Sequence, residues 1–330
     1  MPLKILFAMG ISLMLAHGPW AQAVPTPRVV VSILPIHSLV SGVMQGTGTP
    51  TLIVKGYGSP HTYRMRPSVA RVLHSADLIF WVGPTLETFL RKPLSALPKT
   101  TRVIALLEID GLTLIGNRRG GSWEGHSHSH QQFPDDHPHS GGNHSPLPEA
   151  TQLLGYNPHI WLHPGNVRQL IKAIARELSR LDPPREARYR ANAEAVLRRI
   201  GGLEAKIRTR LSPLEGIPYL VFHDAFAYLE RHYRLRAVGS ITASPEQIPG
   251  ARRIVELRAT VRRLGVRCIF REPQFNAKLI ETTLQDTGVN IGDLDPLGIG
   301  IPSGPDHWFS MMEGISEGMV GCLGTGQGDS

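Results

Sequence analysis

The stretch RVVVSILPIHSLVSGVM, residues 28–44, places a strand pattern directly before a helix pattern. Residues 28–33 form a β-branched run that is typical of a strand buried on both faces of a parallel sheet. Residues 35–44 are predicted to be helical. Because parallel sheets are built from strands that alternate with helices, this stretch predicts an α/β fold.

The same alternation continues along most of the chain. Downstream of the first unit, strands are predicted at residues 51–54, 77–82 and 102–106, and helices at 67–75 and 87–97. After residue 213 the pattern returns, with strands at 219–222, 236–241 and 267–270 and helices at 225–233, 247–264 and 276–286. We therefore predict two lobes, each a mainly parallel sheet flanked by helices.

A long helical connector is predicted between the lobes, at residues 166–212, where apolar residues keep helical spacing. Pro183 and Pro184 should break or kink it, because proline removes a backbone donor and clashes with the preceding turn. Gly201 and Gly202 form a second weak point. The predicted division is a signal peptide at 1–23, an N-terminal lobe at 24–165 with a His-rich loop at 120–146, the connecting helix at 166–212 and a C-terminal lobe at 213–330.

The N-terminus has the features of an export signal. Lys4 precedes an apolar run at residues 5–16, and Ala21-Gln22-Ala23 is a small-x-small cleavage site, so cleavage is expected after Ala23. The run is too short for a membrane anchor, and a buried N-terminal helix is the alternative. We expect a soluble, monomeric periplasmic protein. That compartment permits a disulfide between Cys268 and Cys322, with two buried thiols as the alternative.

The net charge of +8 raises the question of an anionic partner. The arginines are interleaved with acids, no basic run is paired with stacking aromatics, and only 6% of residues are aromatic. We therefore interpret the charge as a solvated basic surface and expect no nucleic-acid binding.

Fifteen histidines are the main functional signal, and six of them lie in one polar stretch, GGSWEGHSHSHQQFPDDHPHSGGNH. Neutral imidazole is a common ligand for transition metals, so this stretch is interpreted as an exposed accessory metal-binding loop. An incidental polar insertion or a tag is the alternative. The six residues are His126, His128, His130, His137, His139 and His144.

Three other histidines lie on predicted loops or strand ends. His61 follows the strand at 51–54, His159 lies in NPHIWL before the connector, and His223 ends the strand at 219–222. Three converging imidazoles match a Zn²⁺ site with a fourth position filled by water or a carboxylate. Asp295, in the loop GDLDPLG, is the best carboxylate candidate. Isolated surface or core histidines are the alternative.

Several segments together resemble the zinc-binding periplasmic solute-binding proteins of ABC importers, the ZnuA-type members of the cluster A-I metal-binding family. They are VVVSILPIHSLVSGVMQG, GSPHTYRMRPSVARVLHSADLIFWVGPTLETFL, NPHIWLHP, VFHDAFAYLE, ASPEQIPGARRI, REPQF and LDPLG. The resemblance runs from about Val29 to Leu323. It implies two α/β lobes bridged by a long rigid helix, with the metal held between them.

The resemblance also implies site residues. His61, His159 and His223 match the family's ligand motifs, and the two cysteines match a C-lobe disulfide of many zinc-type members. Pro60 and Thr62 depart from the family pattern, where some members carry a carboxylate before the first histidine and Asp is frequent after it. The fourth ligand is therefore Asp295 or water. Manganese and iron members usually supply two carboxylates, so three imidazoles favour zinc.

Other polar residues receive weaker assignments. Asp224 either orients an imidazole or sits at a helix N-terminus. Glu272 is interpreted as part of a surface or interlobe ion pair, with a position near the cleft as the alternative. Five further histidines are interpreted as structural or exposed: His37, His74, His163, His232 and His307.

The predicted function is periplasmic capture of Zn²⁺ and its delivery to a membrane permease that works with an ATPase. The alternatives are a manganese- or iron-type relative, a metal-sequestering or adhesive exported protein, and a secreted zinc hydrolase. The hydrolase finds little support, because there is no His-Glu-x-x-His helix and no convincing acid–base partner, so we expect no enzyme.

Overall fold

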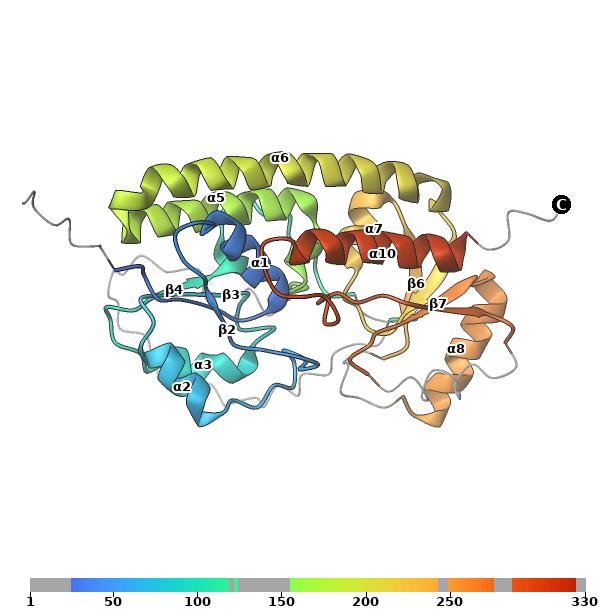
Figure 1. Ribbon diagram of the computed structural model, residues 1–330. Helices are drawn as coiled ribbons and strands as arrows, with labels where there is room; N and C mark the ends of the chain where they lie inside the picture. Colours follow the sequence, from blue (N-terminus) through green and yellow to red (C-terminus); the bar gives the residue numbers. More distant parts are fainter. Residues whose placement is uncertain (1–24, 119–121, 124–154, 243–248, 276–286, 325–330) are drawn as a thin grey trace, which may run out of the picture.

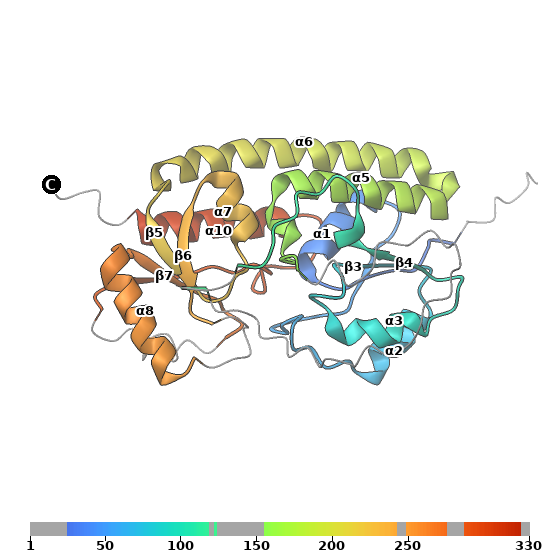
Figure 2. The ribbon, with the colours of Figure 1, turned by 180° about the vertical axis from the view of Figure 1, so that it is seen from behind.

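The strand-forming runs of the two halves assemble into two separate parallel sheets in the computed structural model (Figures 1 and 2). The structure describes residues 25–118, 122–123, 155–242, 249–275 and 287–324. Strand order is β2-β1-β3-β4 in the N-terminal lobe and β6-β5-β7-β8 in the C-terminal lobe. The strands are β1 Val29–Val31, β2 Thr51–Leu52, β3 Leu78–Trp81, β4 Arg102–Ala105, β5 Pro218–Val221, β6 Arg236–Ser240, β7 Cys268–Arg271 and β8 Asn290–Asp293.

Helices cover these sheets. In Figure 1, α2 and α3 lie below the N-terminal sheet and α1 and α5 above it, so the central strands β1 and β3 are buried along their whole length. Burial on both faces explains why these strands are continuous apolar runs. The two-lobe α/β prediction is confirmed. The helices are α1 Leu34–Val43, α2 Pro67–His74, α3 Arg91–Ser95, α5 Pro164–Leu181, α6 Glu186–Leu211, α7 Ala227–Tyr233, α8 Ala251–Leu264 and α10 His307–Leu323.

The connector is a helical hairpin instead of one kinked helix. The proline pair lies in a short 3-10 turn, Pro183–Arg185, after which α6 runs back along α5 (Figures 1 and 2). The buried Asp182 carboxylate fixes this turn, because Arg185 Nη1 donates to it over 2.8 Å and the Tyr189 hydroxyl over 2.7 Å. The predicted kink is thus a reversal of direction, and α6 alone is the long helix between the lobes.

The expected weak point at Gly201 and Gly202 is also corrected, since α6 continues through both residues without a break. Each glycine costs about 1 kcal/mol relative to alanine in a helix interior, which tertiary packing can offset. That packing comes from both lobes, because α6 contacts α1 on one side and α10 on the other.

Helix α10 was not predicted from the sequence, and it ties the two lobes together. Its first residues reach the N-terminal lobe, where the Trp308 backbone N–H donates to Ser38 Oγ over 2.9 Å. The Trp308 indole donates to the Trp161 carbonyl over 2.9 Å, and the Trp161 indole donates to the Pro296 carbonyl over 2.7 Å. These are buried hydrogen bonds, so wide separation of the lobes would leave buried polar groups unpaired.

A disulfide joins Cys268 on β7 to Cys322 on α10, as expected. It fastens the C-terminal helix to the second sheet across a sequence separation of 54 residues. The close approach of α10 to the sheet also requires Gly318, because a Cβ there would lie 2.6 Å from the Asp293 carbonyl oxygen.

Three predictions fall on segments outside the described residues: the signal peptide at 1–23, the His-rich stretch and the helix at 276–286. Among the residues that the structure describes, no helix combines the length and the apolar character needed to cross a bilayer.

Candidate metal centre

Three histidines from distant parts of the chain meet between the lobes. His61 lies in the loop between β2 and α2, His159 comes immediately before the 3-10 turn Ile160–Leu162 that leads into α5, and His223 follows β5. Each contributes one ring nitrogen to a group whose members all lie within 4.8 Å of one another. His159 and His223 are about 95% buried, with exposed fractions of 4% and 5%, and His61 is partly exposed. No other such group occurs among the described residues.

Neighbouring side chains fix the orientation of the two buried rings. The Asn157 Oδ1 atom lies 2.8 Å from His159 Nδ1, and Glu272 Oε1 lies 2.5 Å from His223 Nδ1. The Asn157 amide is itself oriented, because its Nδ2 donates to the Asp224 carbonyl over 2.5 Å while its oxygen accepts from the His159 backbone N–H. His159 Nδ1 must therefore be the donor, and its Nε2 carries the lone pair.

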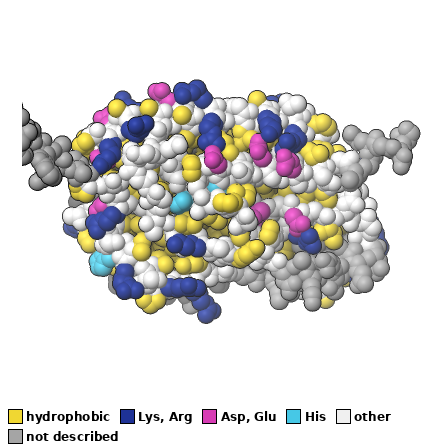
Figure 3. All heavy atoms as spheres, in the orientation of Figure 1, with side chains coloured by type: hydrophobic (Ala, Val, Ile, Leu, Met, Phe, Trp, Pro, Cys, Tyr) yellow, Lys and Arg dark blue, Asp and Glu magenta, His cyan; other side chains and the backbone are white. Residues whose placement is uncertain are grey.

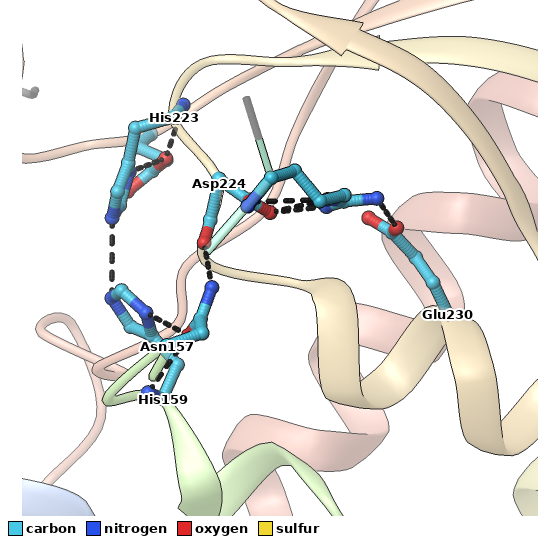
Figure 4. A network of polar contacts seen from close by, with 7 residues as sticks. Asn157, His159, His223, Asp224 and Glu230 are labelled. Atoms are coloured by element: carbon cyan, nitrogen blue, oxygen red, sulfur yellow. Dashed lines mark hydrogen bonds and ion pairs between the residues drawn. The ribbon is translucent and has the colours of Figure 1, made fainter. Parts of the chain in front are cut away.

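The two rings point their Nε2 atoms at each other across 3.2 Å (Figure 4). When Glu272 is ionised, His223 Nδ1 is also a donor, and both Nε2 atoms present lone pairs at this distance. Two lone pairs so close repel, so a proton or a cation must lie between them. In a tetrahedral zinc site with Zn–N bonds of about 2.05 Å, two nitrogens are separated by about 3.3 Å. The observed separation fits that arrangement.

Glu272 lies directly behind His223, a placement near the cleft that the sequence interpretation ranked below an ion pair. It was assigned to a surface or interlobe ion pair, whereas its side chain is buried and bonds the His223 ring. Burial raises the pKa of Glu272, and the opposing effect of His223 is smaller. Its Oε2 atom is buried and accepts no hydrogen bond among the described residues. A carboxylate behind a metal-binding imidazole strengthens that imidazole as a ligand.

A charged network supports the Asn157 side of the site (Figure 4). The Asp224 carboxylate, which neither orients an imidazole nor caps a helix, binds the Arg118 guanidinium instead. Arg118 Nη1 also donates to Glu230 over 2.5 Å, and its guanidinium lies 3.5 Å from the centre of the Trp123 ring. Burial disfavours the charge on Arg118, but Glu230 and Asp224 more than compensate and raise its pKa. The ion pairs of Arg118 therefore fix the loop that contains Asp224. The backbone carbonyl of Asp224 in turn accepts the hydrogen bond that orients the Asn157 amide.

Asp295 lies close to this site but outside the three-histidine group. Its carboxylate accepts hydrogen bonds from the backbone N–H groups of the following turn, at Leu297, Gly298 and Ile299, and from Gln274 Nε2 over 2.9 Å.

The remaining histidines have structural surroundings, as expected. His163 Nδ1 accepts from the Asn166 N–H at the start of α5, and His232 contacts Glu204 over 2.8 Å. His37 and His307 contact backbone carbonyls, and His74 is exposed on α2. Burial, followed by the nearby His232, lowers the pKa of His163 to about 4, so this ring is neutral at pH 7.

The cavity at the three histidines is very small. Only about 10 Å³ is open to the centre of a water-sized sphere, and the walls include Pro60, Trp161 and Phe275 besides the histidines. A volume of this order holds one ion or one water molecule. The site therefore has room for a bare cation.

We predict that Asn157→Ala weakens zinc binding by about 10- to 100-fold, the usual effect of removing a group that orients a metal ligand. The His159 ring would lose the acceptor that fixes its tautomer. Calorimetric titration with Zn²⁺ measures the change. The matched control is Asn192→Ala, which removes a part-buried asparagine that bonds the Val43 carbonyl far from the histidines. Equal affinities of the two variants would contradict the role of Asn157.

Comparison with known proteins gives consistent matches. Residues 29–322 match the family described as zinc-uptake complex component A, periplasmic. The chain is 40% identical over 304 residues to the high-affinity zinc uptake system protein ZnuA of Brucella abortus, an alignment that covers 89% of this chain and 91% of that protein. It is 33% identical over 319 residues to the protein of the same description from Yersinia pestis, with 96% of both chains covered.

Solved structures agree on the architecture. A crystal structure of ZnuA superposes with a TM-score of 0.71 at 23% identity, covering 91% of this chain and 100% of that chain. The laminin-binding protein Lmb of Streptococcus agalactiae, described as an adhesin with metal-transporting activity, gives the same TM-score, identity and coverage. At such identities these likenesses establish the fold alone.

Proposed function

We propose that this chain, which belongs to the family of periplasmic components of zinc-uptake complexes, captures Zn²⁺ and delivers it to the permease of an ABC importer. His61, His159 and His223 are the proposed ligands. The observation that carries the proposal is the 3.2 Å approach of two buried imidazole Nε2 atoms whose other ring nitrogens are hydrogen-bonded. A zinc ion resolves that repulsion and displaces the proton that otherwise occupies the site.

Zinc fits the ligand set better than manganese does. Imidazole nitrogens suit zinc, whereas manganese prefers carboxylate and carbonyl oxygens. We assign the fourth position to water, because Asp295 would have to release hydrogen bonds from Leu297, Gly298 and Ile299 to reach the ion. The accessory role of the His-rich stretch remains part of the proposal.

Release of zinc in this account involves local movement around the histidines. The buried Trp161 and Trp308 hydrogen bonds and the helix α6 tie the lobes together, which opposes wide opening. His61 is the exposed member of the set and lies on a loop, so it is the ligand best placed to leave first. Docking on a permease with its ATPase would supply the trigger. Export with cleavage after Ala23 is part of the proposal, and it is supported by the family description, which names a periplasmic component.

Neither a secreted zinc hydrolase nor an adhesive protein gains support as the function. A hydrolase needs a substrate groove beside the metal, and the cavity at the three histidines is small. The adhesive alternative has only a likeness of fold behind it. The relatives of 30% identity or more that we cite are described as zinc uptake proteins.

Deletion of residues 124–144, which keeps the Trp123 contact with Arg118, tests whether the folded site or the His-rich stretch provides the tight binding. We expect calorimetry to show the high-affinity binding step unchanged and weaker binding steps lost, because ordering a polar chain around an ion costs conformational entropy. Manganese should give no tight binding to either protein. Loss of the high-affinity binding step on deletion would contradict the proposed site.

A further inference from the structure

The N-terminal lobe carries a strongly cationic face that zinc capture does not explain. Besides Arg91, which donates to the Pro84 carbonyl, six exposed basic residues lie between residues 51 and 100, on the His61 loop, on α2, and on and after α3. The only acids in this range are Asp77, which is paired with Arg28, and Glu87, which is fully buried. Among the described residues none of the six forms an ion pair. We call them the cationic face: Lys55, Arg64, Arg66, Arg71, Lys92 and Lys99.

The face is continuous in space, because α2 and α3 pack against each other. In Figure 3 the lower left of the molecule, where α2 lies in Figure 1, shows dark blue side chains and no magenta ones among them. This distribution differs from that on α6, where many arginines are paired with acids of the same helix or of α10.

The positive charge of the cationic face does not serve to attract the metal ion. Lys55 and Arg64 lie in the same loop as His61, and positive groups beside the mouth of a site repel an approaching divalent cation. A partner with negative charge is the complementary interpretation, since potentials of opposite sign steer encounters and fix their register.

The shape of the face indicates a protein partner. A surface groove of about 330 Å³ runs beside the edge strand β2, and its lining combines apolar Leu52, Val69 and Val72 with Lys55 and Arg66. Next to it Tyr57 is 73% exposed, the most exposed large hydrophobic residue among those described. Arginine and tyrosine around an apolar depression are typical of protein–protein interfaces. A flat lipid surface would leave the groove unfilled.

We propose that the cationic face docks the N-terminal lobe onto the permease of the importer, with the groove receiving a permease segment that carries carboxylates around an apolar side chain. This inference rests on the proposed function, because it assumes that a permease receives the zinc. In this arrangement the permease contacts the loop that carries His61. The same loop would then take part both in docking and in release of the ion.

The test uses two double variants with the same change in net charge. The groove variant reverses the charge of the groove by Lys55→Glu and Arg66→Glu. The α6 variant reverses the charge of two exposed arginines on the opposite side of the N-terminal lobe, by Arg188→Glu and Arg198→Glu. Binding to the permease–ATPase complex of the same organism, held in lipid nanodiscs, is measured at low and high ionic strength. We expect the groove variant to bind about tenfold or more weakly and with less salt dependence, while the α6 variant matches the wild type.

Controls separate this inference from the proposed function. In calorimetry the α6 variant should keep the zinc affinity of the wild type, and the groove variant should bind zinc at least as tightly, because it replaces positive charge near the His61 loop by negative charge. Equal nanodisc binding by the two double variants would overturn the cationic face alone. Binding of the wild type to empty nanodiscs of the same lipids, lost in the groove variant, would also overturn it in favour of a lipid surface. Failure of the wild type to bind zinc would instead overturn the proposed function.

Discussion

His223→Ala should weaken zinc binding by about a hundredfold to a thousandfold. Structural zinc sites with four ligands contribute about 10–16 kcal/mol, so one ligand corresponds to about 3 kcal/mol, or more than two orders of magnitude in Kd. The loss should reach at least this size, because the variant also removes the partner of the buried Glu272. His61→Ala and His159→Ala should have losses of the same order.

The measurement needs a background without competing sites. We would use the protein lacking residues 124–144 and compete for zinc with a chelator of known affinity, since direct titration underestimates very tight binding. His74→Ala is the matched control, because His74 is exposed on α2 and belongs to no metal-binding group among the described residues. Zinc binding by His223→Ala as tight as that of His74→Ala would remove His223 from the ligand set.

Replacing both Cys268 and Cys322 by alanine should lower the free energy of unfolding by about 4 kcal/mol. The estimate follows from the loop-closure entropy of a cross-link that spans 54 residues. Both cysteines are buried, and the bond fastens α10, whose other end carries the Trp308 contacts to the N-terminal lobe. The C-terminal lobe should therefore become the less stable part of the molecule.

Denaturant unfolding followed by circular dichroism measures this change. Reduced wild-type protein is the control, because it lacks the cross-link but keeps both sulfur atoms, and it should lose a similar amount. A double variant as stable as the oxidised wild type would show that buried packing of α10 suffices without the bond.

Most strands of both sheets could be predicted from the sequence, because buried parallel strands are short, uninterrupted β-branched and aromatic runs. Val29–Val31 and Leu78–Trp81 are examples. The edge strand β8, Asn290–Asp293, lacks this signal because it is mostly exposed, and it was not among the predicted strand ranges. Helix α10 escaped prediction for a different reason. Gly314, Gly318 and Gly321 lower its intrinsic helix propensity, and the helix exists because of its packing on α1, α6 and β8.

The proline pair shows a limit of local patterns. Pro183 and Pro184 predict an interruption, but a kink and a reversal have the same local signature. The direction of α6 depends on Asp182, whose hydrogen bonds to Arg185 and Tyr189 become visible only in three dimensions.

At the site, the three histidines were selected by their loops and by family motifs, and the structure brings their side chains together. Asn157 carried a signal that was overlooked, because an asparagine two residues before His159 is well placed to accept from that residue's backbone N–H. Glu272 could not be assigned by pattern alone. A glutamate after a strand has the same local sequence whether it pairs with a surface arginine or lies buried behind an imidazole.

An anomalous-difference map at the zinc absorption edge, from crystals of the zinc-loaded protein lacking residues 124–144, decides where the ion is held. We predict one strong peak at about 2.0–2.1 Å from the Nε2 atoms of His159 and His223 and from a ring nitrogen of His61. A zinc-loaded crystal with no peak among these three rings, or with the ion bound elsewhere on the molecule, would contradict the site.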